Sequence, residues 1–219
     1  MNKAQLLLCA APDPELAGQL TRFLETWLAG APDGERSGRV LVRLPDDPMR
    51  GHVTDGRPTY EAIVEIGPMS SPNTLVESLR GASSALGDLV EIGASAVIAG
   101  TVATIKPGTG DLQLSFIMSR RPDMTAAEFH RYWRYEHVRH AHTDGMVGYH
   151  QFHGDPILSA ELAAASGFDR CDVDGIAECY LEHVVGFTTN PPTDRGDRVN
   201  FADEATEVGV ILRTVCANP

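Results

Sequence analysis

The sequence predicts an α+β fold made of two ferredoxin-like halves in tandem. Apolar runs and amphipathic segments follow the order strand–helix–strand–strand–helix–strand twice along the 219 residues. The breaker-rich segment KPGTG, at residues 106–110, lies between the two repeats of this order. Each half would carry its helices on one side of an antiparallel sheet, so two sheets can cover each other's open faces. We therefore expect one half over residues 1–106 and a second over residues 111–219.

The first half is predicted from alternating apolar runs and from segments with helical spacing. Leu16, Leu20, Phe23, Leu24 and Trp27 recur at intervals of three and four residues, as on one face of a helix. The elements expected here are strands at residues 4–10, 40–44, 60–66 and 94–104 and helices at residues 14–28 and 73–86.

The second half is predicted to repeat this order and to start its first helix with a capping box. Thr125 and Glu128 have the three-residue spacing at which each side chain can bond the other residue's backbone N–H. A second helix is expected to begin near residues 182–188, and the Pro- and Gly-rich loop 190–200 is interpreted as a lid or an exposed connection. The other elements expected are a helix at residues 125–140 and strands at residues 112–119, 147–153, 175–182 and 207–215.

Composition excludes several classes of partner. The formal net charge is −12, whereas nucleic-acid binding relies on Lys and Arg to neutralise phosphates, so we expect no nucleic-acid partner. Cys9, Cys171, Cys179 and Cys216 are far apart and form no CxxC pair, which favours free thiols in a reducing compartment. No apolar run is long enough to cross a membrane, so we expect no membrane partner and a cytoplasmic protein.

The segment 114–153 is the most informative part of the chain, because it holds six of the eight histidines and one of the two tryptophans. If residues 125–140 form one helix, the arginines fall on a solvated face and the aromatic rings and imidazoles face inward. Buried ionisable groups are costly unless paired, and Glu136 and His140 have the four-residue spacing that allows pairing. The expected inward face comprises Phe129, Tyr132, Trp133, Glu136, His137 and His140.

The following strands add polar groups to this set. Successive side chains of a strand face opposite sides, so Tyr149 and His153 point together and away from His150. In the next predicted strand, Glu178 and Tyr180 alternate with small apolar residues and are expected to face a cavity.

Three motifs stand out in the second half: RRPDMTAAEFHRYWRYEH at residues 120–137, GYHQFH at residues 148–153 and DGIAECYLE at residues 174–182. Together they resemble the EthD family, a branch of the dimeric α/β-barrel superfamily. The chain departs from the family where Val138-Arg139 replaces a frequent Gly-Pro, and the first half looks like a degenerate copy. The resemblance implies a dimeric α/β-barrel-like arrangement of the two ferredoxin-like halves and a homodimer. It also implies a small apolar pocket without a cofactor.

These features together predict a cofactor-free enzyme that transfers protons on an apolar, aromatic or polyketide-like carbonyl compound. A neutral imidazole can remove a proton next to a carbonyl while a second histidine or a tyrosine protonates the oxygen. His137, Tyr149 and His153 are the catalytic candidates, and Glu178 (or Glu136) would orient an imidazole. The reaction expected is a dehydration, a cyclisation or an isomerisation, as in a lyase or isomerase. The residues expected to bind substrate are Phe129, Tyr132, Trp133, His140 and Tyr180, with no metal.

Three alternatives remain open at this point. The protein can be a ligand-binding or assembly protein without chemistry, or it can be a cofactor-free monooxygenase. It can also bind metal or haem through His137 with His130, or with His140 and His142, although the spacing does not match the HExxH zinc motif. In the favoured hypothesis His130, His142 and His150 are peripheral.

Overall fold

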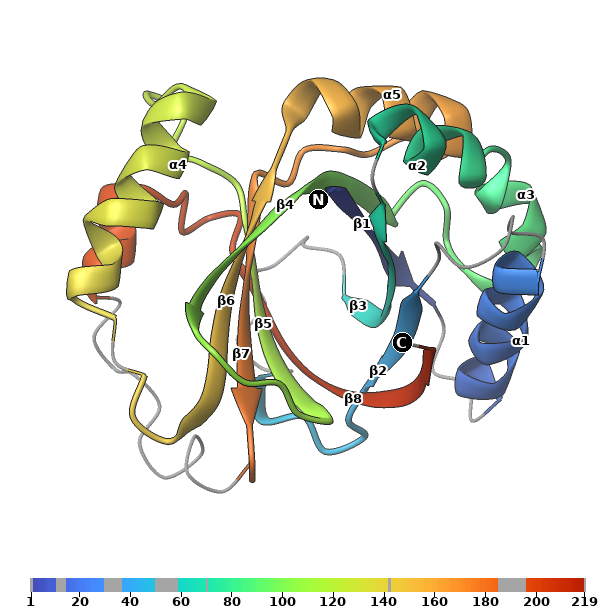
Figure 1. Cartoon of the computed structure of the whole chain (residues 1–219), viewed down its shortest axis with the longest axis horizontal. Coiled ribbons are helices and arrows are strands. Elements are labelled where there is room, and N and C mark those ends of the chain that lie inside the picture. The colour runs from blue at the N-terminus through green and yellow to red at the C-terminus, as the bar shows by residue number, and fades with distance from the viewer. Residues whose placement is uncertain are drawn as a thin grey trace.

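In the part of the chain that the structure describes, eight strands form a closed antiparallel barrel with helices on its outer surface (Figure 1). The computed structural model describes residues 2–10, 15–29, 37–49, 59–69, 71–141, 143–184 and 196–218. The strands are β1 (Asn2–Cys9), β2 (Gly38–Arg43), β3 (Tyr60–Met69), β4 (Ala96–Lys106), β5 (Leu112–Met118), β6 (Met146–Gly154), β7 (Gly175–Leu181) and β8 (Val208–Asn218). The helices are α1 (Leu16–Ala29), α2 (Pro72–Ser78), α3 (Ala82–Leu86), α4 (Ala126–Tyr135) and α5 (Pro156–Ser166), with 3₁₀ turns η2 (Gly87–Leu89), η3 (His137–Arg139) and η4 (Gly196–Asn200).

The strand order around the barrel is β1-β3-β2-β8-β5-β7-β6-β4. The strands β1–β4 are therefore contiguous, as are β5–β8, and the two sets join where β2 pairs with β8 and where β4 pairs with β6. The α+β class expected from the sequence is confirmed, with a closed barrel. The division at residues 106 and 111 and the pairing of ferredoxin-like halves stay predictions.

The helix predicted over residues 125–140 is shorter than expected. Its capping box is confirmed, because Thr125 accepts from the backbone N–H of Glu128 and the Glu128 side chain accepts from that of Thr125. However, α4 ends at Tyr135 and η3 follows, so His137 and His140 do not continue the helical face of Phe129. Glu136 pairs with Arg139 at 2.8 Å, not with His140 as expected.

Two further helices differ from the prediction. The helix expected over residues 73–86 is divided by Gly81, whose positive φ of 71° is left-handed and interrupts the helical backbone between α2 and α3. Helix α5 was not expected, because its small and apolar residues are spread around the helix and give almost no periodicity. Of the helix expected near residues 182–188, the described residues 182–184 are not helical and the rest lies outside the described residues.

Three hydrophobic clusters hold these layers together. One fills the barrel interior and includes Leu7, Ile63 and Phe152. A second lies between β1–β4 and the helices α1, α2, α3 and α5, and a third lies between β5–β8 and α4. Figure 1 shows α4 and η4 on one side of the barrel and α1, α2 and α3 on the other. Among the described residues, no helix combines the length and apolarity needed to span a bilayer.

Candidate functional site

The residues predicted to form one site lie in three separate places. Glu178 faces the inside of the barrel, while Tyr149 and His153 face outward beneath α4. His137 lies in η3, beyond the end of α4. The alternation predicted for β6 and β7 is correct, but it sends these groups to opposite faces of one sheet. In the described chain, the four catalytic candidates therefore do not share a cavity.

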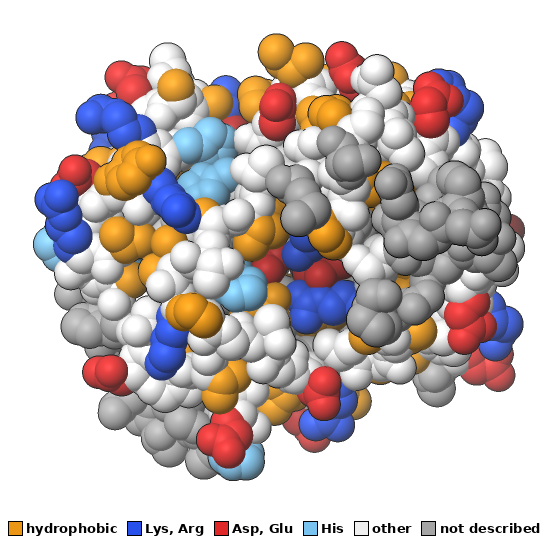
Figure 2. Space-filling view, viewed as in Figure 1, with side chains coloured by type: hydrophobic (Ala, Val, Ile, Leu, Met, Phe, Trp, Pro, Cys, Tyr) orange, Lys and Arg blue, Asp and Glu red, His pale blue; other side chains and the backbone are white. Residues whose placement is uncertain are grey.

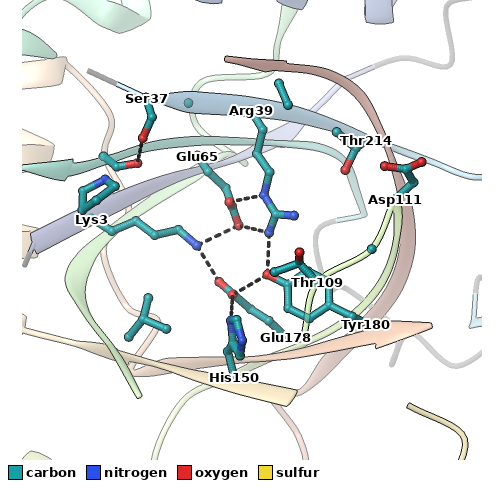
Figure 3. Close-up of a pocket in the computed structure, with 16 residues that line it drawn as sticks. Lys3, Ser37, Arg39, Glu65, Thr109, Asp111, His150, Glu178, Tyr180 and Thr214 are labelled. Atoms are coloured by element: carbon teal, nitrogen blue, oxygen red, sulfur yellow. Dashed lines mark hydrogen bonds and ion pairs between the residues drawn. The ribbon is translucent and has the colours of Figure 1, made fainter. Parts of the chain in front are cut away.

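One end of the barrel interior is filled by a buried network of charged side chains (Figure 3). The Nζ of Lys3 lies 2.8 Å from Oε1 of Glu178 and 3.0 Å from Oε1 of Glu65. Arg39 pairs with Glu65 and donates from Nη2 to the Tyr180 hydroxyl at 2.8 Å. That hydroxyl in turn donates to Oε2 of Glu178 at 3.1 Å. Two cations thus face two carboxylates.

For Glu65 and Lys3 in this network, the charged partners outweigh the effect of burial on the pKa. Burial alone would raise the pKa of Glu65, but Arg39 and Lys3 hold it at about 2. Burial would lower the pKa of Lys3, yet Glu178 and Glu65 raise it. A cavity of about 570 Å³ opens onto the network, and Figure 2 shows acidic and basic side chains at the bottom of a hollow there. Each carboxylate already accepts from several donors. The network is therefore better suited to stabilising this end of the barrel, here called the barrel mouth, than to transferring protons.

His150 lies at this barrel mouth, although the sequence suggested a peripheral place. Its Nδ1 is 3.9 Å from Oε2 of Glu178, and its ring meets the Tyr180 ring edge-on with centroids 5.0 Å apart. Glu178 and Tyr180 do face a cavity as expected, but the imidazole beside them is His150, not His137 or His153.

A second site is built around His137 and Asp197. The Nδ1 of His137 lies 3.3 Å from Oδ2 of Asp197. The other oxygen of this carboxylate accepts from the Tyr132 hydroxyl at 2.8 Å and from Nδ2 of Asn200 at 2.7 Å. Because a carboxylate only accepts, Nδ1 of His137 carries the hydrogen and Nε2 keeps its lone pair. Asp197 therefore fixes both the orientation and the tautomer of the imidazole.

The electrostatics of this pair keep the imidazole neutral and the carboxylate charged. Burial lowers the pKa of His137 below 6.5, and the hydrogen bond and charge of Asp197 only partly oppose it. Burial would raise the pKa of Asp197, but bonds from Asn200, Tyr132 and His137 lower it. The His137 side chain is 14% exposed, so it is only partly shielded from solvent. His137 thus has the form of an oriented general base.

Aromatic rings pack beside this pair. The His137 ring lies 5.0 Å from the Phe201 ring, and Phe201 stacks on Tyr132 at 5.8 Å and on Trp133 at 6.3 Å between centroids. Phe129, Trp133 and Phe201 are fully buried. Phe129 and Trp133, expected to bind substrate, therefore form the packed layer behind the pair, and Tyr132 holds Asp197.

Sequence reasoning missed Asp197 as the partner of His137. It lies in the Pro- and Gly-rich loop 190–200, of which residues 190–195 are outside the described residues and 196–200 form η4. The only local signal is the Asp–x–x–Asn spacing of Asp197 and Asn200, which is too common to identify a site. The contact to His137 exists only in the folded chain.

The third place holds His153 of β6 and His130 of α4. Their Nδ1 atoms are 3.0 Å apart, and the His153 ring packs on Trp133 with centroids 4.6 Å apart. Tyr149, on the same face, is buried and bonded to Gln151 at 3.2 Å, and burial raises its pKa to about 12. Tyr149 and His153, expected to act together as acid and base, therefore lie on one face but form no hydrogen bond with each other in the described contacts.

The described residues do not support the metal-binding hypothesis with a cluster of ligands. They contain no group of three or more His, Cys, Asp or Glu side chains that could hold an ion. His140 is exposed, and His142 lies outside the described residues.

The fold is shared with solved structures of low sequence identity. An anthrone oxidase-like protein matches with a TM-score of 0.64 at 13% identity, over 99% of this chain and 92% of that one. A candidate chlorite dismutase matches with 0.55 at 9% identity over 98% and 95% of the two chains. A candidate monooxygenase from Lactobacillus acidophilus matches with 0.51 at 12% identity over 99% and 94%. No family model matches the sequence, and no curated protein matches it.

These comparisons support a related barrel fold without naming EthD, and they correct the functional prediction. The expected redox-neutral dehydration, cyclisation or isomerisation is contradicted, because the matched structures are described as oxidase-like, monooxygenase and chlorite dismutase proteins. The lyase and isomerase assignments are therefore wrong. Cofactor independence is withdrawn with them, because oxygen and one-electron chemistry is commonly carried by a cofactor. The oxidative alternative fits these structures better.

Proposed function

We propose that this protein is an oxidoreductase that acts on a small aromatic molecule, with His137 as the base that takes a proton from the substrate. The observation that carries this proposal is the hydrogen-bonded pair of His137 and Asp197. The oxidative reaction is supported by the descriptions of the structures that share the fold, above all the anthrone oxidase-like protein.

The chemistry requires a substrate with an acidic hydrogen, such as a CH₂ group between aromatic rings that are conjugated with a carbonyl, or a phenolic O–H. Nε2 of His137 takes this proton, and Asp197 stabilises the imidazolium that forms. The resulting carbanion or phenolate is electron-rich and gives electrons to an oxidant. With molecular oxygen as the oxidant, a CH₂ group becomes a carbonyl and the second oxygen atom leaves as water. A hydroquinone instead loses two electrons and two protons to become a quinone, and oxygen leaves as hydrogen peroxide.

Haem binding is the second candidate, and the same imidazole favours it. A histidine that ligates a metal usually donates its other ring N–H to a carboxylate, as His137 does to Asp197. His130 and His153 fit less well, because both ring nitrogens of each are engaged in hydrogen bonds. When bound, haem supplies one-electron and oxygen chemistry, and His137 is the residue that would hold it.

We also infer that the barrel consists of two ferredoxin-like halves related to the EthD family. The order β4-β1-β3-β2 in one set of strands matches β8-β5-β7-β6 in the other, which supports the two halves. A homodimer, a small apolar or aromatic ligand and a cytoplasmic location belong to the same proposal. Free cysteines at positions 9, 171, 179 and 216 support a reducing compartment.

Oxygen uptake and product mass test the proposal directly. The purified protein is incubated with anthrone and with a naphthohydroquinone in an oxygen-electrode cell, and the products are analysed by mass spectrometry. We expect oxygen consumption and an oxidised product. A parallel absorption titration with hemin reports haem binding, which should be lost in His137→Gln and kept in His183→Gln, a change at an exposed histidine after β7. Products isomeric with their substrates, without oxygen uptake, would refute the oxidative reaction.

A further inference from the structure

A second groove lies on the outer surface where α4, β4, β6 and the start of α5 meet. Its volume is about 650 Å³. Figure 2 shows histidine side chains beside basic and hydrophobic ones at this place, over α4. The cationic part of the lining consists of Arg131 and Arg134, beside the imidazoles of His130 and His153, and the apolar part includes Val102, Tyr135, Pro156 and Ile157.

The apolar part of this groove is unusually exposed. Val102 is 38% exposed, Tyr135 is 60% exposed and Ile157 is 72% exposed. Large hydrophobic side chains that gather beside polar groups on a surface are typical of a binding site. The three residues come from β4, α4 and α5, so only the folded chain brings them together.

The cationic part of the groove carries an unsatisfied donor. Nη1 of Arg134 is buried and has no hydrogen-bond partner among the described residues. A buried guanidinium nitrogen without an acceptor is costly, and an anionic group is its best partner. The acid in the lining, Asp155, is engaged, because its Oδ1 accepts from the backbone N–H groups of Ile157 and Leu158 at the start of α5. The solvated face expected for the arginines is thus wrong for Arg134, which is half-buried.

The two histidines beneath the groove lack one proton. Nε2 of His130 faces the carbonyl of Gly154 at 2.8 Å, and Nε2 of His153 faces Oε1 of Gln151 at 3.2 Å. The orientation of Gln151 is set by its Nε2, which donates to the Trp133 carbonyl at 3.1 Å. Both Nε2 atoms must therefore donate, and the contact between the two Nδ1 atoms needs a further hydrogen. Two neutral imidazoles carry two hydrogens, whereas these three contacts need three.

We propose that this groove binds an amphipathic anion, an aryl or alkyl carboxylate, and that binding draws one proton onto the pair of His130 and His153. The carboxylate accepts from Arg134, and the charge of the imidazolium pair stabilises it without a further hydrogen bond, because all four ring nitrogens are engaged. The apolar body lies against Tyr135 and Ile157. This site is separate from the pair of His137 and Asp197 and does not depend on the function proposed above.

The surrounding charges explain why the proton arrives with the ligand. Burial, His130 and Arg134 lower the pKa of His153 to about 3. Burial and Arg120 also lower the pKa of His130, although the Gly154 carbonyl, Asp174 and Asp155 oppose this. Both rings are therefore neutral at pH 7 in the free protein. An anion beside them offsets the repulsion from Arg134 and stabilises the charged pair.

Calorimetric titration tests both parts of this proposal. The probe is 2-naphthoate, with the neutral 2-naphthamide as its matched control, at pH 7 in two buffers of different ionisation enthalpy. We expect naphthoate to bind at least about tenfold more tightly than the amide, the size of one charge-assisted hydrogen bond. The apparent heat should differ between the buffers by an amount that corresponds to an uptake of about one proton per ligand.

Variants on the same segment then locate the site. Arg134→Gln should weaken naphthoate binding about tenfold or more, and His153→Asn should abolish the proton uptake. Arg139→Gln is the matched control, because Arg139 is exposed and paired with Glu136 outside the groove. Equal affinity for acid and amide, or wild-type affinity in Arg134→Gln, would overturn the anion site. Naphthoate binding with the same heat in both buffers would overturn the linked protonation, and that test needs no variant.

Discussion

Oδ2 of Asp197 lies 3.3 Å from Nδ1 of His137, although sixty residues separate the two along the chain. The imidazole lies in η3, after the last turn of α4, and the carboxylate lies in η4, before β8. Tyr132 and Asn200 hold the carboxylate from the side away from the imidazole. This arrangement makes His137 the best-oriented base among the histidines whose contacts are described.

Asp197→Asn should lower the oxidation rate about a hundredfold, within the usual contribution of an oriented acid or base. Because Tyr132 and Asn200 donate to Oδ1, the amide turns its NH₂ group toward Nδ1 of His137 and favours the tautomer with its hydrogen on Nε2. The charge that raises the pKa of His137 is also lost. The midpoint of the acid limb of the rate profile should therefore move to lower pH. Steady-state kinetics across pH measure both effects. Asp169→Asn, at an exposed position, is the control, and an unchanged rate in Asp197→Asn would argue against the pair.

Tyr132→Phe distinguishes a positioning role from the substrate-binding role expected from the sequence. Loss of one of the donors to Asp197 should cost about 1 kcal/mol and lower kcat by about tenfold or less. The pKa of Asp197 should rise, because its bond to Tyr132 helps to lower it. A rise in KM with an unchanged kcat and an unchanged pH profile would instead indicate direct contact with substrate.

The pH dependence of the reaction follows from the neutral state of His137. A base acts only when deprotonated, so the rate falls as pH drops through the pKa of His137. Burial places this pKa below 6.5, so the rate should stay at its plateau at pH 7 and fall at lower pH, with a midpoint below 6.5. A profile of kcat/KM against pH measures the midpoint. A midpoint above 6.5 would be incompatible with a desolvated His137 as the base.

The charged network in the barrel mouth should govern acid stability. Glu65 has a lowered pKa, so it stabilises the fold above its unfolded pKa of about 4.5, and this stability is lost as pH falls toward 2. The shift corresponds to about 3 kcal/mol. Glu65→Gln should be about that much less stable at pH 7 and should lose less stability between pH 4.5 and 2.

Urea unfolding at a series of pH values measures this difference. Glu77→Gln is the matched control, because Glu77 of α2 forms an exposed ion pair with Arg80, just past the end of that helix, and such pairs contribute little. Parallel stability curves for wild type and Glu65→Gln would show that the network does not set the acid limit.

Gly175→Ala should disturb the packing between β7 and α4. A Cβ at position 175 would lie 2.4 Å from Cζ3 of Trp133, and such overpacking costs about 1–3 kcal/mol. Because the His153 ring packs on Trp133, the fluorescence of the indole should change as well. Gly93→Ala is the control, since a Cβ there meets nothing within 4 Å. Thermal unfolding that is the same for both variants would contradict the tight contact.

The alternation of side chains along β6 and β7 was predictable from the sequence, but which face lines the barrel interior was not. Period-two spacing correctly separates Tyr149 and His153 from His150. Which of the two faces becomes the inside depends on how the sheet closes, and closure depends on pairs such as β4 with β6 that no local pattern encodes. From the sequence alone, Glu178 and His153 were therefore assigned to one pocket, although they lie on opposite faces of the sheet.

Helix ends and remote partners account for the remaining differences. The start of α4 was predictable because Thr125 and Glu128 form a local capping box. The end of α4 was not predictable, because no glycine or proline follows Tyr135 directly. The predicted position of His137 on the inward face of the helix was therefore wrong as well. Asp197 could not be paired with His137 from sequence, since tertiary contacts bring η4 to η3.

The most direct test of the central claim is the rate of oxygen uptake by His137→Gln compared with wild type, using anthrone as substrate and His183→Gln as the control. We expect the rate of His137→Gln to fall about a hundredfold or more below that of wild type, while the variant remains folded by circular dichroism, and we expect His183→Gln to keep the wild-type rate. Oxygen uptake by His137→Gln at the wild-type rate would show that His137 is not the base.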